Sequence, residues 1–121
     1  MTQRKVRAYL LDIEQACALL ARFTSGKTLA DYLSDPMLRS AVERQFEIIG
    51  EALNRGVTLD PRLAHRVTDT ASIVAFHNRL IHGYSTVSDE VVWGILQGKL
   101  PTLQREVHAL LSEPAESSGA E

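Results

Sequence analysis

Residues 35–56, DPMLRSAVERQFEIIGEALNRG, contain the clearest helical pattern in the chain. Asp35 precedes Pro36, the order of an N-cap residue followed by proline in the first helical turn. Gly50 indicates close packing against a neighbouring element, and Gly56 is expected to end the helix as its C-cap. The stretch predicts one long helix, because its apolar residues recur at helical spacing: Leu38, Val42, Phe46, Ile49 and Leu53.

The preceding segment predicts a first helix of about twenty residues. Ser25 and Gly26 are suitable residues to end it, and the connector KTLADYLSD that follows is expected to be partly helical. The inward face of this first helix carries apolar residues at steps of three and four: Val6, Leu10, Ile13, Cys17 and Leu20.

Two further helices are predicted in the second half of the chain. Thr68 or Asp69 is expected to cap the third helix, which should end near Gly83. The fourth begins at residues 88–90 and is expected to be kinked or interrupted at Pro101. Because no alternating strand pattern occurs, the fold class is predicted to be all-α, an antiparallel bundle of four to five helices. The bundle should span residues 1–112, and residues 113–121, which are acidic and poor in apolar side chains, should form a disordered tail.

Composition predicts a single soluble domain. The chain has 121 residues, of which 45% are hydrophobic and 23% charged. No apolar run could span a membrane, and no signal-peptide core is present, so a cytoplasmic protein is expected. The net charge of −2 offers no general attraction for nucleic acid, so phosphate binding would need a local patch or oligomerisation. The single cysteine, Cys17, is interpreted as a small buried hydrophobe.

Residues 76–84, FHNRLIHGY, are the candidate functional segment because polar side chains are dense there. Asn78 and His82 are four residues apart and share a helix face, whereas His77 and His82 diverge by about 140°. The two histidines therefore do not suit one metal ion within one chain, and neither a metal nor a cofactor is expected. A helix-capping role for His82 and a packing role for Tyr84 are the structural alternatives.

The sequence contains no glycine-rich phosphate loop, nucleophile elbow or suitably spaced carboxylate pair, so most enzyme classes lack support. Metal-free phosphoryl chemistry on RNA stays open. In such chemistry a histidine moves protons and a cation stabilises the charge on the phosphorane. The candidate segment contains both residue types.

Three separated stretches give the chain a family resemblance: RQFEIIGEALNR at 44–55, NRLIHGY at 78–84 and VVWGILQGKLPTL at 91–103. Together they resemble the HEPN domain proteins of the HepT type, small bacterial toxins encoded beside a minimal nucleotidyltransferase antitoxin. The resemblance implies a homodimer in which the motif helices of two subunits meet and cut RNA without metal.

The resemblance also implies residue roles. His82 matches the catalytic histidine, and Asn78 matches the polar residue that follows the family's arginine. Tyr84 matches the tyrosine that the antitoxin of some members modifies with AMP. His77 stands in place of the arginine, and histidine is mostly neutral at pH 7 and lacks the guanidinium fork. Arg79 is a candidate phosphate-binding substitute, although it lies about 200° around the helix and is also readily explained as a surface or dimer-contact residue.

Two main functional hypotheses follow. In the first, the protein is an endoribonuclease toxin with His82 as general acid or base, His77 as a partial phosphate clamp and Asn78 orienting the phosphate or His82. In the second, it is a catalytically attenuated dimer that acts as a binding partner or regulator of a nucleotidyltransferase. Nucleotide sensing in the dimer cleft is a third alternative.

Overall fold

The computed structural model describes residues 2–82 and 87–114, and all the regular secondary structure in these residues is helical. The all-α prediction is confirmed. Two short helices in the connectors, and a break in the predicted last helix, raise the number above the predicted four to five. The seven helices of the described residues are α1 (Thr2–Thr24), α2 (Leu29–Ser34), α3 (Pro36–Leu59), α4 (Leu63–Arg66), α5 (Thr70–His82), α6 (Asp89–Gly98) and α7 (Leu100–Ser112).

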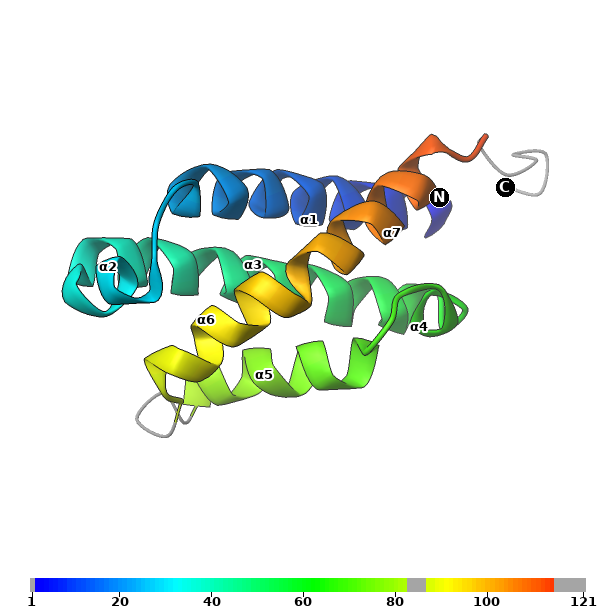
Figure 1. The fold of residues 1–121 in the computed structure, drawn as a ribbon. Coiled ribbons are helices and arrows are strands. Elements are labelled where there is room, and N and C mark those ends of the chain that lie inside the picture. The colour runs from blue at the N-terminus through cyan, green and yellow to red at the C-terminus, as the bar shows by residue number, and fades with distance from the viewer. Residues whose placement is uncertain (1, 83–86, 115–121) are drawn as a thin grey trace.

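Helix α3 lies between α1 and α5 and runs in the opposite direction to both (Figure 1). Helices α6 and α7 continue one another diagonally across this layer, and α7 packs on α1. The end of α7 is fastened to α1 by a hydrogen bond of 3.1 Å from Arg7 Nη1 to the carbonyl oxygen of Leu111. The buried core therefore lies between the layer and the α6–α7 pair.

The predicted start of α3 is confirmed by its N-cap. Asp35 Oδ1 accepts hydrogen bonds from the backbone N–H groups of Met37 and Leu38 at 3.1 and 3.2 Å. The predicted end is wrong, because α3 continues to Leu59 and Gly56 is buried inside it. A Cβ at Gly56 would lie 3.0 Å from Leu63 Cδ2, so the absence of a side chain at Gly56 allows close packing against α4.

The side chains of the residues proposed to cap α5 serve another purpose. The Thr68 hydroxyl donates to Glu106 of α7 at 2.5 Å, and Asp69 accepts a hydrogen bond from Lys99 at 2.8 Å. Asp69 directly precedes Thr70, and its carbonyl oxygen accepts a hydrogen bond from the N–H of Ile73 at 2.9 Å, so it occupies the predicted N-cap position, while both side chains tie the start of α5 to the α6–α7 pair. The predicted break near Pro101 is confirmed, because α6 ends at Gly98 and α7 begins at Leu100.

The predicted apolar faces form the core. Every residue named for the inward faces of the first two predicted helices is buried, including Cys17, whose pKa burial raises to about 12. Cys17 is thus a protonated core residue at neutral pH. None of the described helices combines the length and apolar character needed to cross a membrane. Residues 115–121 of the predicted tail lie outside the described residues.

Candidate functional site

Helix α5 carries most of the candidate segment and has two contrasting sides. Leu80 is buried in the core, and Ile73 and Phe76 pack against the core on the side of α6 and α7. Asn78 and His82 are both exposed. They lie one helical turn apart near the end of α5, as their spacing predicts. Because Asn78 is about 200° around the helix from Phe76, the polar pair faces away from the α6–α7 pair.

His77 does not join this exposed pair. Its exposed fraction is 4%, and its Nδ1 has no hydrogen-bond partner among the described residues. The ring is held where α5 crosses α3, because a Cβ at Gly50 would lie only 2.1 Å from the Cβ of His77. Gly50 therefore makes the close helix contact that was predicted for it, and the residue it accommodates is His77.

Glu51, a charged residue of α3, lies beside His77. Glu51 Oε1 lies 3.7 Å from His77 Nε2, which is too long for a hydrogen bond but within the range of an ion pair when the imidazole is protonated. Arg55 Nε donates to Glu51 Oε2 at 2.5 Å, and this bond is the main reason that the pKa of Glu51 lies below its ordinary value. Glu51 was not predicted as a site residue, although it stands next to Gly50, for which a close contact was predicted.

The two remaining candidates are Arg79, which stands three residues before His82 and therefore beside it on the surface of α5, and Tyr84. Arg79 is exposed on α5, about 200° around the helix axis from His77, so it points away from the α3 contact. Tyr84 belongs to residues 83–86, which lie outside the described residues. Its predicted modification therefore stays a prediction. The described residues contain no group of three or more His, Cys, Asp or Glu side chains that could hold a metal ion.

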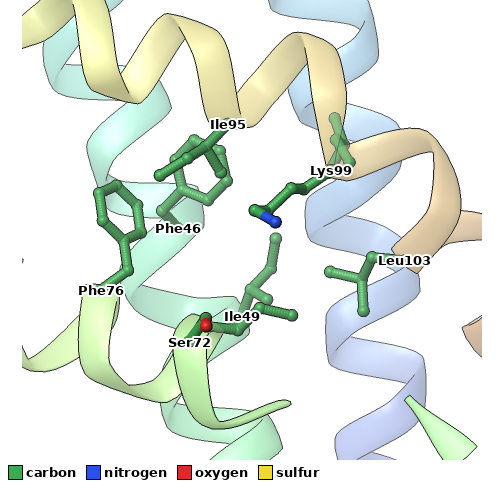
Figure 2. A pocket seen from close by; sticks show the side chains of 9 residues that line it. Phe46, Ile49, Ser72, Phe76, Ile95, Lys99 and Leu103 are labelled. Carbon is green, nitrogen blue, oxygen red and sulfur yellow. The ribbon is translucent and has the colours of Figure 1, made fainter. Parts of the chain in front are cut away.

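A hollow lies between α3, α5 and the α6–α7 pair (Figure 2). Phe46 and Ile49 of α3 and Phe76 of α5 line it together with residues of α6 and α7. Its lining is almost entirely apolar, and the amine of Lys99, which also lines it, is paired with Asp69 at 2.8 Å. An apolar hollow of this kind offers little to phosphate, so the candidate site for RNA chemistry is the polar side of α5.

Comparison with known proteins agrees with the helical architecture and the motif. The family model described as Ribonuclease HepT-like matches residues 13–110. A "Putative RNase" of Caldanaerobacter subterraneus subsp. tengcongensis is 31% identical over 107 residues, which are 88% of this chain and 95% of that protein. A "Putative RNase" of Methanocaldococcus jannaschii is 32% identical over 88% of this chain and 97% of its own length. A "Probable ribonuclease HepT" of Thermococcus cleftensis is 31% identical over 89% of this chain and 97% of its own length. No solved structure matches at a significant level.

Proposed function

Since this chain belongs to the HepT-like ribonuclease family, we propose that it is a metal-independent endoribonuclease and the toxin of a bacterial toxin–antitoxin system. The observation that carries the proposal is the exposure of His82 and Asn78, one turn apart at the end of α5. Groups in this position can meet an RNA phosphate without any movement of the core.

The proposed reaction needs one proton transfer at each end of the scissile bond. The ribose 2′-hydroxyl attacks the adjacent phosphorus, and the bond from phosphorus to the 5′ oxygen breaks, which leaves a cyclic phosphate and a free 5′-hydroxyl. His82 accepts the proton of the attacking hydroxyl or donates one to the leaving oxygen, because an imidazole exchanges protons near neutral pH. Asn78 donates from its amide to a non-bridging phosphate oxygen, or orients His82.

The test is cleavage of purified RNA by the protein in the presence of a chelator. We expect His82→Ala to lower the cleavage rate by about 10² to 10⁴-fold, the usual contribution of general acid–base catalysis. The matched control is His65→Ala, which removes an exposed histidine on α4. Unchanged cleavage by His82→Ala would remove His82 from the mechanism, and loss of wild-type cleavage with chelator would show that a metal is required.

We further propose a homodimer and an antitoxin partner in the cytoplasm. The partner is a minimal nucleotidyltransferase that transfers AMP to Tyr84. In that step the phenol oxygen attacks the α-phosphorus of ATP, and pyrophosphate leaves. The bulky anion would then stand two residues from His82 and exclude RNA phosphate by charge and size. Incubation with ATP and a minimal nucleotidyltransferase should add the mass of one AMP, and Tyr84→Phe should abolish the addition.

The burial of His77 favours a second candidate, an attenuated dimer that regulates a nucleotidyltransferase. The family's arginine position here holds a side chain that is 5% exposed and directed at Glu51, so it brings little positive charge to the surface. His77→Arg discriminates between the two functions. A clear gain of RNA cleavage would show that the natural protein is attenuated, whereas efficient cleavage by the wild type with no gain would reject this candidate.

A further inference from the structure

His77 does not bring a cation to the proposed ribonuclease site. Its side chain starts in the contact between α5 and α3, since a Cβ at Gly50 would lie 2.1 Å from the Cβ of His77. From there it stays buried, with 4% of its surface exposed and Nε2 facing Glu51. RNA cleavage places negative charge on phosphate oxygens, and a fixed positive group beside them is the usual means of stabilising that charge. Such a group should therefore lie on the exposed face of α5.

Helix geometry places Arg79 on that face, beside His82. Asn78 and Arg79 precede His82 by four and three residues, so they lie about 40° and 60° from it around the axis, on opposite sides. All three side chains are exposed. Cβ atoms at these spacings are about 5 to 6 Å apart, so one phosphate above His82 is within reach of both neighbours. His82 thus stands between an amide and a guanidinium.

The same face is open toward the start of α5. Ala71 and Ala75 are exposed, and each lies about 20° around the axis from His82. Their methyl groups are too small to block a phosphate backbone that approaches along the helix. An RNA strand can therefore lie along α5 and bring one phosphate to the face formed by Asn78, His82 and Arg79.

The end of a helix also increases the need for a cation. The last carbonyl groups of α5 carry partial negative charge, which opposes an approaching phosphate. Arg79 and His82 are the basic residues in this last turn. Arginine is always charged and offers two parallel N–H groups to phosphate, whereas a histidine that transfers protons is neutral for part of the reaction. Arg79 is therefore the residue of this turn suited to hold the phosphate.

Two arginines of α3 are directed elsewhere. Arg39 pairs with Asp89 of α6, and Arg44 pairs with Glu47 in a groove between α1 and α3. We propose that Arg79 binds the phosphate at which RNA is cut and supplies the cation of the site. The inference rests on the proposed ribonuclease function.

The first test is the rate of RNA cleavage. We expect Arg79→Gln to lower kcat/KM by about 10 to 100-fold, the effect of losing one charge-assisted hydrogen-bonding group. Arg79→Lys should keep part of the activity, because it retains the charge but not the fork. Arg22→Gln is the matched control, since Arg22 is exposed in the last turn of α1, which α3 separates from α5 (Figure 1). Equal effects of Arg79→Gln and Arg22→Gln, or no effect of either, would overturn the inference.

A purely structural role of Arg79 predicts a different result. A cation in the last turn stabilises a helix, and an exposed arginine can also contact a second subunit. Circular dichroism and sedimentation equilibrium of Arg79→Gln measure these two effects. We expect the helix content and the mass of the wild type together with the reduced kcat/KM. If cleavage is lost only together with helix content or with a change in mass, Arg79 has a structural role and the inference fails.

The second test measures binding without cleavage. In the His82→Ala background, affinity for a short fluorescein-labelled oligouridylate is followed by fluorescence anisotropy at increasing salt. Arg79→Gln should reduce the slope of log affinity against log salt by about 0.7, the value for one phosphate contact with a single strand, and Arg22→Gln should leave it unchanged. An unchanged slope with Arg79→Gln would reject the inference even if the wild type cleaves RNA. A wild type that never cleaves RNA would instead reject the proposed function, while the slope still tests Arg79.

Discussion

Gly50 shows how one residue controls the position of a candidate site residue. A Cβ at this position would lie 2.1 Å from His77 Cβ and 2.4 Å from its Cγ, distances that real Cβ atoms do not reach. The crossing of α3 and α5 is therefore as close as it is only because residue 50 lacks a side chain. This closeness buries His77 and leaves Glu51 beside it.

We predict that Gly50→Ala will lower the free energy of unfolding by about 1 to 3 kcal/mol, because the added methyl group must push α5 away from α3. Urea denaturation followed by circular dichroism measures the change. Gly94→Ala is the control, because a Cβ there meets no atom within 4 Å and alanine favours a helix interior by about 0.5 to 1 kcal/mol. Equal urea midpoints for Gly50→Ala and the wild type would contradict the close-contact argument.

The spacing of residues along α5 predicted some features of the candidate site but not the burial of His77. The shared exposed face of Asn78 and His82 was predictable, because both positions belong to one helix and helical geometry fixes their relation. The burial of His77 against Glu51 was not, because it depends on the register between α3 and α5. The sequence predicted that Gly50 packs closely against another element, but it did not show that the residue in contact is His77.

Charged side chains gather where α2, α3 and α6 meet, namely Arg39 and Glu43 of α3 and Asp89 of α6. Tyr32 of α2 is fully buried, and its ring centroid lies 5.4 Å from that of Trp93. Glu43 lies one turn beyond Arg39 on α3, and its pKa is raised, first by burial and then by the nearby charges of Asp89 and Glu47. The ionised form of Glu43 is therefore disfavoured by folding.

A pH dependence of stability follows from this cluster. The pKa of Glu43 is higher in the folded than in the unfolded chain. The stability that protonated Glu43 contributes to the fold is therefore fully present below the unfolded pKa of about 4.3 and is lost as the pH rises through the folded pKa. We predict that Glu43→Gln will raise the free energy of unfolding at pH 7 by up to about 1 kcal/mol, after allowance for solvent screening, with little change at pH 3.5 to 4. Urea denaturation at both pH values measures the difference.

The control for Glu43→Gln should change stability in the opposite direction. Glu90 is exposed in the first turn of α6, where its charge is favoured by the helix dipole. Glu90→Gln should therefore lower the free energy of unfolding at pH 7 slightly. A stabilisation by Glu43→Gln that is as large at pH 4 as at pH 7 would show that packing, and not charge, is responsible.

The length of a helix decided whether the sequence could predict it. The long helices α1 and α3 were predictable because their apolar pattern repeats over several turns, Asp35 caps α3 as expected, and α6 begins at the predicted residues with Ser88 as its N-cap. Helix α4 spans only four residues, too few to show a period. It is held by the buried Leu63 against Gly56, a tertiary contact that also explains why Gly56 does not end α3.

In the whole molecule, the layer formed by α3 and α5 has an apolar side and a polar side. Helices α6 and α7 cover one side, and Asn78 and His82 are exposed on α5 away from them. Ile81 lies among these polar residues with 42% of its surface exposed. A second copy of the chain placed there would cover Ile81 and bring two sets of Asn78, Arg79 and His82 to one cleft. The proposed homodimer would thereby supply the local positive charge that a chain with net charge −2 lacks.

We predict that Ile81→Asp will weaken this dimer by about 10 to 100-fold in dissociation constant, because it replaces apolar contact worth about 1.5 to 3 kcal/mol with a buried charge. Sedimentation equilibrium should give the wild type a mass of twice 13.4 kDa and show a shift toward monomer for the variant. Val91→Asp is the control, since Val91 is 51% exposed on α6, away from α5. RNA cleavage by Ile81→Asp should fall at low protein concentration and recover as the concentration rises. If the wild type is monomeric, or if Ile81→Asp and Val91→Asp dissociate equally, the subunits do not meet through this end of α5.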